Sequence, residues 1–249
     1  ISRIWDGDHT VWKPEPTEIS NRLGWLTVTD TMAGQSDDLE SLGRDVREAG
    51  TRHVVVLGMG GSSLGPEVLR QSFGSAPGYP ELIVLDSTVP DWVGSVADTI
   101  DPAHTVFIVS SKSGSTTEPN MFYAYFRNLV EKAVGPDRAG QHFVAVTDPG
   151  TTLEKMAKDQ GFRRVFANPA DIGGRYSVLS YFGLVPAALV GLDLVKLIDR
   201  ADGIRRSCAP DVLVHENPGA WLGAVIGGLA LQGRDKLTLV SSPSINSFG

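Results

Sequence analysis

A dense cluster of hydroxyl side chains lies between residues 110 and 117 of this sequence. The segment Ser110-Ser111-Lys112-Ser113-Gly114-Ser115-Thr116-Thr117 combines six hydroxyls with one lysine, and a helical pattern begins directly after it. Hydroxyl groups and free backbone N–H groups at a helix N-terminus can bind phosphate without a metal ion. A capping turn rich in serine and threonine is the alternative, but capping needs only one hydroxyl. The excess favours a phosphate-binding loop.

Two other segments have residues suited to binding an anion. Gly58-Met59-Gly60-Gly61-Ser62-Ser63-Leu64-Gly65-Pro66 combines glycines, which let a ligand approach the backbone, with two serines near a predicted helix start. The segment 170–177 places Arg175 after two glycines, where it could supply positive charge to a phosphate or a developing oxyanion. A tight turn without a ligand and an ordinary surface arginine are the alternative interpretations of these segments.

The glycine-rich segment fits the common nucleotide-binding motifs poorly. It lacks the Gly-Lys-Ser/Thr of a P-loop, and Gly58-x-Gly60-x-x-Ser63 lacks the third glycine of a dinucleotide fingerprint. Asp86 could act as the acidic ribose ligand, but it lies farther from Gly58 than the roughly 20 residues of that fingerprint. An NAD-dependent enzyme stays a minor alternative, which titration with NAD and with phosphosugars would separate from a phosphosugar-binding protein.

The elements that must position these loops follow from the apolar pattern. Continuous aliphatic runs predict strands that are buried on both faces, and helical patterns lie between them. The alternation predicts a doubly wound α/β fold with about five parallel strands, so the three loops follow strands at one edge of the sheet. The predicted strands span 53–58, 82–86, 105–110, 142–147 and 164–167, and the predicted helices span 36–49, 66–73, 90–100, 118–134 and 151–158.

The pattern changes after residue 167. Helices are predicted over 175–190, 195–208 and 218–232, followed by one more strand at 236–240. The longest apolar stretch, 182–192, is too short for a membrane span, which needs about 20 residues, so it predicts a buried helix.

The net charge and the cysteine count limit which partners and which sites the protein can have. The 249 residues carry 22 Lys+Arg and 29 Asp+Glu, which gives 22 − 29 = −7, so we expect neither nucleic acid nor an anionic membrane as the main partner. One cysteine, Cys208, excludes a disulfide framework and a multi-cysteine metal site. It also fits a reducing compartment, and no signal segment is visible near Ile1, so a cytoplasmic protein is expected.

Three motifs in these loops resemble the phosphoglucose isomerase family, whose two halves each carry the sugar-isomerase (SIS) fold. They are Gly60-Gly61-Ser62-x-Leu64-Gly65-Pro66, Ser111-Lys112-Ser113-x-Ser115-Thr116-x-Glu118 and Gly173-Gly174-Arg175-Tyr176-Ser177-x-x-Ser180-x-x-Gly183. The resemblance implies an N-terminal arm over 1–35 and a first SIS domain over 36–200. Residues 201–249 would form linker helices and the first strand of a second, incomplete SIS domain. The segments 5–12 and 22–25 resemble the isomerase portion of the bifunctional transaldolase/phosphoglucose isomerases.

The resemblance also implies an activity and a set of roles. The family interconverts glucose 6-phosphate and fructose 6-phosphate through a cis-enediol(ate), without a cofactor or a metal. Arg175 would stabilise the charge of that intermediate, and the full-length protein would be a homodimer in the cytoplasm. The phosphate of the hexose would be held by Gly61, Ser62, Ser111, Lys112, Ser113 and Thr116, with Lys112 acting through its backbone N–H.

Two catalytic groups of the family have no match in this sequence. Glu118 aligns with the helix start of the phosphate loop, Glu216 comes too early after Arg175, and the family's spacing places the proton-transferring glutamate past Gly249. None of the five histidines occupies the position of the ring-opening residue. We therefore expect residues 1–249 alone to bind a phosphosugar weakly and to turn it over little or not at all. A non-catalytic phosphosugar-binding SIS module that regulates a partner is the alternative.

Overall fold

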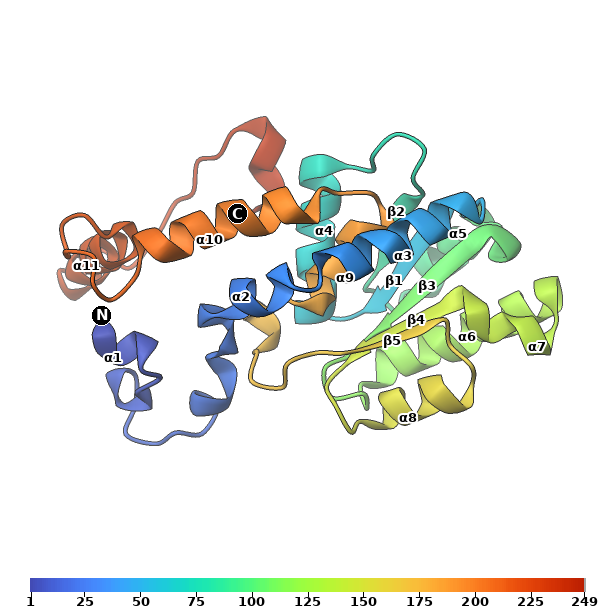
Figure 1. The fold of residues 1–249 in the computed structure, drawn as a ribbon, viewed down its shortest axis with the longest axis horizontal. Helices are drawn as coiled ribbons and strands as arrows, with labels where there is room; N and C mark the ends of the chain where they lie inside the picture. The colour runs from blue at the N-terminus through green and yellow to red at the C-terminus, as the bar shows by residue number, and fades with distance from the viewer. Residues whose placement is uncertain (249) are drawn as a thin grey trace.

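The computed structural model describes residues 1–248, and its centre is a five-stranded sheet in which every neighbouring pair of strands is parallel (Figure 1). The strand order is β2-β1-β3-β4-β5. This confirms the predicted fold class and the five predicted strands. They are β1 (His53–Gly58), β2 (Glu81–Leu85), β3 (Thr105–Ser110), β4 (Phe143–Thr147) and β5 (Arg164–Ala167).

Helices cover both faces of the sheet. Side chains alternate along each buried strand, so Val54 and Val56 face the layer that contains α3 and α9, whereas Val55 and Leu57 face the layer of α5, α6 and α8. The longer helices are α3 (Ser36–Glu48), α4 (Gly61–Phe73), α5 (Pro90–Thr99), α6 (Thr117–Val134), α8 (Thr152–Asp159), α9 (Tyr181–Leu189), α10 (Leu194–Ser207) and α11 (Pro218–Leu231); α1 (Ser2–Trp5), α2 (Val28–Ala33) and α7 (Pro136–Ala139) are short.

Two helix boundaries differ from the sequence prediction by more than one residue. α4 begins at Gly61 rather than at Pro66, because its glycines allow the first turn to pack directly against neighbouring backbone. The predicted helix over 175–190 is divided: Gly174–Tyr176 form a 3-10 turn, and α9 starts only after Ser180, whose hydroxyl accepts a hydrogen bond from Phe182 N–H. Arg175 therefore lies before the helix, not at its start.

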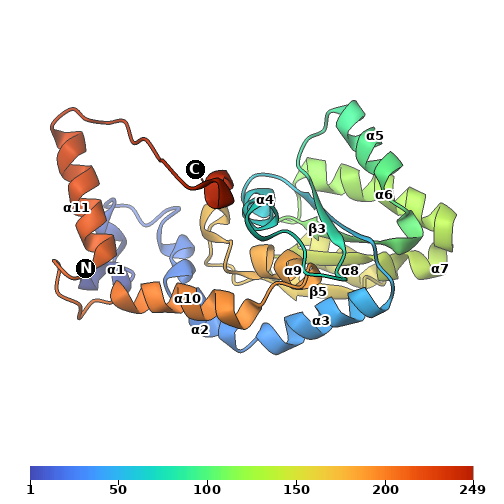
Figure 2. The same ribbon diagram turned by 90° about the horizontal axis from the view of Figure 1, so that it is seen from above.

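The predicted strand over 236–240 is wrong. These residues pair with no strand of the sheet, and Leu237, Leu239 and Val240 are largely exposed. A short segment that contains leucine, threonine and valine forms a strand only where a neighbouring strand supplies hydrogen-bond partners, and none lies beside it among residues 1–248. Instead the chain returns to the sheet domain, where a short turn over Pro243–Phe248 contacts α4 (Figure 2).

α11 stands apart from the sheet. Figures 1 and 2 both place it at the opposite end of α10 from the sheet, near α1. Its sequence is apolar almost throughout, yet none of its residues is buried, and Trp221 and Leu222 are more than half exposed. Among residues 1–248, no helix combines the length and the apolar character that crossing a membrane requires.

Candidate phosphate-binding site

All three loops singled out by their chemistry lie at one edge of the sheet. Because the strands are parallel, their carboxyl ends meet at the same edge, where the loops after β1, β3 and β5 begin. The strand order reverses direction between β1 and β3, and ligands of open α/β sheets bind at such switch points. The phosphate loop, defined as residues 110–117, and the glycine-rich loop after β1 flank this point.

In the phosphate loop the hydroxyls of Ser111, Ser113 and Thr116 form one cluster. Ser111 Oγ lies 3.0 Å from Thr116 Oγ1, and Ser113 Oγ lies 3.4 Å from the same atom. Thr116 is the N-cap of α6, but its side chain makes no capping hydrogen bond. Within residues 1–248, no hydrogen bond uses the N–H of Lys112 or Ser113 as a donor. Hydroxyls and free N–H groups are thus present together at the start of an 18-residue helix.

The glycine-rich loop packs against the loop that carries Arg175. A Cβ atom on Gly61 would lie 2.3 Å from the carbonyl oxygen of Gly174, so only glycine fits. Gly60 has φ 57° and ψ −120°, a conformation that is accessible to glycine. The one O–H of Ser177 is shared between the carbonyl oxygens of Gly174 (2.7 Å) and Gly61 (3.2 Å), which links the two loops.

A proline inside α4 leaves one backbone carbonyl free, and through this carbonyl the start of α4 is hydrogen-bonded to β3. Pro66 has no N–H, so the carbonyl of Ser62, four residues earlier, loses its partner within the helix. The hydroxyl of Ser110, the last residue of β3, donates to this carbonyl at 3.3 Å. Ser62 is buried in the first turn of α4 and therefore lies beside the start of the phosphate loop.

Arg175 is exposed in its 3-10 turn. Within the described chain, its side chain takes part in no hydrogen bond or ion pair. The N-terminal arm packs against this turn. Trp25 stacks on Tyr176 with ring centroids 5.6 Å apart, and the N–H of Gly24 donates a hydrogen bond to Asp171 O at 2.9 Å. The guanidinium group is thus available to a ligand, on a backbone that is fixed from both sides.

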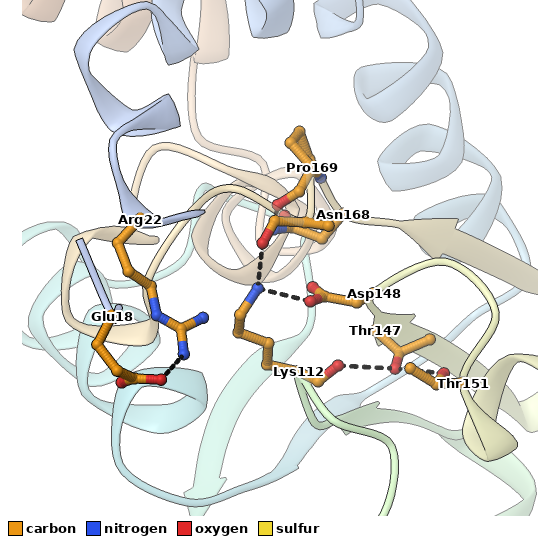
Figure 3. A network of polar contacts seen from close by, with 9 residues as sticks. Glu18, Arg22, Lys112, Thr147, Asp148, Thr151, Asn168 and Pro169 are labelled. Carbon is orange, nitrogen blue, oxygen red and sulfur yellow. Dashed lines mark hydrogen bonds and ion pairs between the residues drawn. The ribbon is translucent and has the colours of Figure 1, made fainter. Parts of the chain in front are cut away.

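Lys112 is the exception among the predicted residues. Its ammonium group donates to Asp148 Oδ2 at 2.5 Å and to the carbonyl oxygen of Ala170 at 2.8 Å (Figure 3). Burial raises the pKa of the Asp148 carboxyl, and the adjacent Lys112 ammonium opposes that shift. Arg22, which pairs with Glu18, acts more weakly in the same direction as Lys112. The backbone N–H of Lys112, by contrast, donates no hydrogen bond within residues 1–248.

The remaining titratable candidates lie elsewhere or have structural partners. His142 is half-buried, its Nδ1 lies 3.0 Å from Thr105 O, and burial lowers its pKa. His215 and Glu216 directly precede α11, the helix that lies at the far end of α10 from the sheet (Figure 2). Within residues 1–248 there is no cluster of three or more His, Cys, Asp or Glu side chains placed to hold a metal ion.

Sequence reasoning missed two residues that support the site, Asp148 and Trp25. Asp148 had a usable signal, because Thr147-Asp148-Pro149-Gly150 follows a predicted strand and must therefore lie at the same sheet edge. Trp25 lies in the segment 22–25 that carries part of the resemblance, but the sequence did not predict its contact with Tyr176, which joins residues 151 positions apart (176 − 25). The predicted set Gly61, Ser62, Ser111, Lys112, Ser113, Thr116 and Arg175 lies on three loops that contact one another.

Comparisons with known proteins agree with this architecture. The family model described as phosphoglucose isomerase matches residues 27–209. A glucose-6-phosphate isomerase of Carboxydothermus hydrogenoformans is 34% identical over 91% of this chain and 50% of its own length. A probable glucose-6-phosphate isomerase of Methanococcus maripaludis is 31% identical over 93% of this chain and 52% of its own length.

Two solved structures share the fold. A hypothetical protein of Thermus thermophilus superposes with a TM-score of 0.76 and 29% identity over 92% of this chain and 51% of its own. A glucose-6-phosphate isomerase of Chlamydia trachomatis gives a TM-score of 0.68 and 25% identity over 79% and 40% of the two chains. The chain thus spans about half the length of the curated relatives it matches. From the match over residues 27–209 we conclude that the chain belongs to the phosphoglucose isomerase family.

Proposed function

We propose that this protein binds the phosphate of a hexose 6-phosphate in the phosphate loop, as part of a glucose-6-phosphate isomerase. The observation that carries the proposal is the hydroxyl cluster of Ser111, Ser113 and Thr116 at the start of α6, beside the free N–H groups of Lys112 and Ser113. Neutral hydroxyls and N–H groups bind a phosphate dianion through charge-assisted hydrogen bonds. A chain of net charge −7 can thus bind an anion locally.

The other predicted residues receive roles in this proposal. Gly61 and Ser62 close the phosphate site from the β1 side, because they contact the loops after β5 and β3 respectively. Arg175 stabilises the negative charge of the cis-enediol(ate) that forms when glucose 6-phosphate and fructose 6-phosphate interconvert. The reaction needs no cofactor, the full-length enzyme is a homodimer, and it acts in the cytoplasm.

Turnover requires a base that moves a proton between C2 and C1. No described residue matches the position of that base in the family, so residues 1–249 should bind fructose 6-phosphate without converting it at a substantial rate. Isomerisation by the purified chain at the rate of a full-length enzyme would contradict this part of the proposal. Binding without turnover is also what a regulatory phosphosugar-binding module would give, so binding alone does not distinguish the two functions.

Ligand-induced stabilisation tests the binding step. A ligand that binds the folded state alone raises the unfolding free energy by about 2.7 kcal/mol at 100 times its Kd. We expect fructose 6-phosphate and glucose 6-phosphate to raise the melting temperature of the chain, whereas fructose and glucose at equal concentration do not. Equal stabilisation by the unphosphorylated sugars, or none by either phosphate, would exclude a phosphosugar site in these loops.

A further inference from the structure

The Lys112 ammonium group connects loops that follow three different strands. Lys112 lies in the phosphate loop after β3, Asp148 follows β4 directly, and Ala170 lies after β5, five residues before Arg175. Figure 3 shows the ammonium between the Asp148 carboxylate and the backbone that leads on from Asn168 and Pro169. We call the two contacts of this ammonium, with Asp148 Oδ2 and with Ala170 O, the Lys112 bridge.

The backbone of the phosphate loop is anchored independently on β4. Asp148 N–H donates to Lys112 O at 3.1 Å, and Ser111 N–H donates to Val146 O at 3.0 Å. By contrast, the hydrogen bond from Lys112 to Ala170 is the one direct hydrogen bond that joins residues 110–117 to residues 168–177 within the described chain. Among the described residues, this ammonium group is therefore the one direct hydrogen-bonding link between the phosphate loop and residues 168–177, which are otherwise connected through the glycine-rich loop.

The Lys112–Asp148 pair is poorly suited to a purely stabilising role. The two side chains are only 22% and 17% exposed, so both charges have lost much of their hydration. The loss of hydration on burial offsets much of the Coulomb attraction in such a pair, and well-packed apolar residues often stabilise a fold as well. What the pair provides that apolar residues could not is a directed hydrogen bond to the Ala170 carbonyl.

We propose that Asp148 is a positioning residue: it holds the Lys112 ammonium on the Ala170 carbonyl and thereby couples the phosphate loop to the loop that carries Arg175. Lys112 then contributes its backbone N–H to the phosphate, and its charge to the bridge. Phosphate bound at residues 110–117 would then also order the loop that carries Arg175, so that Arg175 is held in position when the substrate is bound. This last consequence rests on the proposed function, whereas the bridge itself does not.

Amide hydrogen exchange without any ligand tests the bridge. Asp148→Asn keeps the size of the side chain and lies outside both loops, yet it should make exchange several-fold faster in residues 111–117 and in residues 170–176. Lys112→Gln should do the same, and Lys112→Arg should retain slow exchange because the guanidinium can donate to both acceptors. The matched control is Asp159→Asn, which removes the carboxylate partner of Lys155 on the exposed surface of α8.

Binding of fructose 6-phosphate distinguishes the bridge from a direct contact between the Lys112 side chain and the phosphate. If Lys112 acts through the bridge, Lys112→Gln and Asp148→Asn should each weaken binding by about 3- to 10-fold, and the double variant should lie within about 2-fold of the singles. If the ammonium contacts the phosphate, Asp148→Asn should instead leave binding unchanged or strengthen it, because it frees a cation. That second pattern would overturn the proposal.

The two experiments fail in distinguishable ways. If wild-type protein shows no binding of fructose 6-phosphate, the proposed function is wrong, and the exchange experiment still decides on the bridge. If exchange in residues 170–176 is the same in Asp148→Asn and in wild type, the bridge is wrong, whatever the binding data show. Should Asp148→Asn fail to fold, Lys112→Gln removes the same two contacts and leads to the same decision.

Discussion

At the scale of single residues, the proposed site depends on side chains that have few competing partners. Thr116 occupies an N-cap position without capping its helix, and its hydroxyl lies within hydrogen-bonding distance of two serines. Arg175 has no partner within the described chain, although a packed turn holds its backbone. Residues that keep their donors free while their backbone is fixed are suited to bind a ligand without rearrangement.

Replacing Thr116 by valine should weaken binding of fructose 6-phosphate by about 10-fold or more. Hydrogen bonds to charged groups contribute about 1.5–3 kcal/mol, and valine keeps the shape of the side chain while it removes the hydroxyl. Calorimetric titration gives the affinity. Thr99→Val, at the end of α5 and outside the three loops, removes a hydroxyl that bonds only to Ser95 O and should leave binding unchanged. Equal affinity of both variants would contradict a role for Thr116 in binding the phosphate.

His142 should make stability depend on pH below neutrality. Burial lowers its pKa from the usual 6.5, so between the folded-state pKa and about 6.5 the unfolded chain binds more protons than the folded chain. The free energy of unfolding therefore falls as pH decreases through this range. Urea unfolding of wild type and of His142→Gln at a series of pH values from about 5 to 7 measures the effect. A slope that His142→Gln does not reduce would show that other groups cause it; His215→Asn, at an exposed histidine, is the control.

At the scale of elements, the site exists because the loops after β1, β3 and β5 interlock. Because Pro66 has no N–H, the Ser62 carbonyl has no partner within α4 and accepts a hydrogen bond from the Ser110 hydroxyl. This bond joins the loop after β1 to β3. The absence of a side chain at Gly61 lets the first loop touch the third. The first contact depends on the N–H that Pro66 lacks, and the second depends on the side chain that Gly61 lacks. Replacing either residue by one that has the missing group should therefore weaken the contact between the loops.

Gly61→Ala should lower the free energy of unfolding by about 1–3 kcal/mol, because its Cβ would overlap the Gly174 carbonyl. It should also weaken binding of the phosphosugar, because the loops after β1 and β5 must move apart. Gly94→Ala is the matched control: it lies inside α5 with open space around a Cβ, so it should be neutral or stabilise by up to about 1 kcal/mol. Urea unfolding measures both variants, and equal stability of the two would contradict the packing argument.

Much of this element-scale picture follows from the sequence, and the failures have physical causes. Strands such as 53–58 could be predicted because burial on both faces leaves a continuous aliphatic run. The run 236–240 also contains leucine, threonine and valine, but a strand also needs a neighbour, which composition does not reveal. The phosphate loop could be predicted from its excess of hydroxyls. The Lys112 bridge and the stacking of Trp25 on Tyr176 could not, because they join segments that only the fold brings together.

At the scale of the whole molecule, the chain contains a five-stranded parallel SIS-type sheet and an apolar helix without a covering partner among the described residues. It spans about half the length of the curated relatives it matches. The apolar helix is α11, none of whose residues is buried. Large exposed apolar patches on a folded protein promote association.

The isolated chain should therefore bind a hydrophobic dye and associate at micromolar concentration. Replacing the exposed Trp221 and Leu222 together by glutamine should reduce both effects with little loss of stability, because neither side chain is buried. Dye fluorescence, analytical ultracentrifugation and urea unfolding measure the three properties. A large fall in the free energy of unfolding would show instead that α11 packs against the rest of this chain in solution.

The most direct test of the central claim is an NMR titration of the ¹⁵N-labelled chain with fructose 6-phosphate, with fructose as the reference ligand. We predict that the amide signals of Gly61, Lys112, Ser113 and Thr116 shift in a saturable manner with fructose 6-phosphate and stay in place with fructose. Unchanged signals for these four residues at millimolar fructose 6-phosphate, or identical shifts with fructose, would contradict a phosphate site in the loops after β1 and β3.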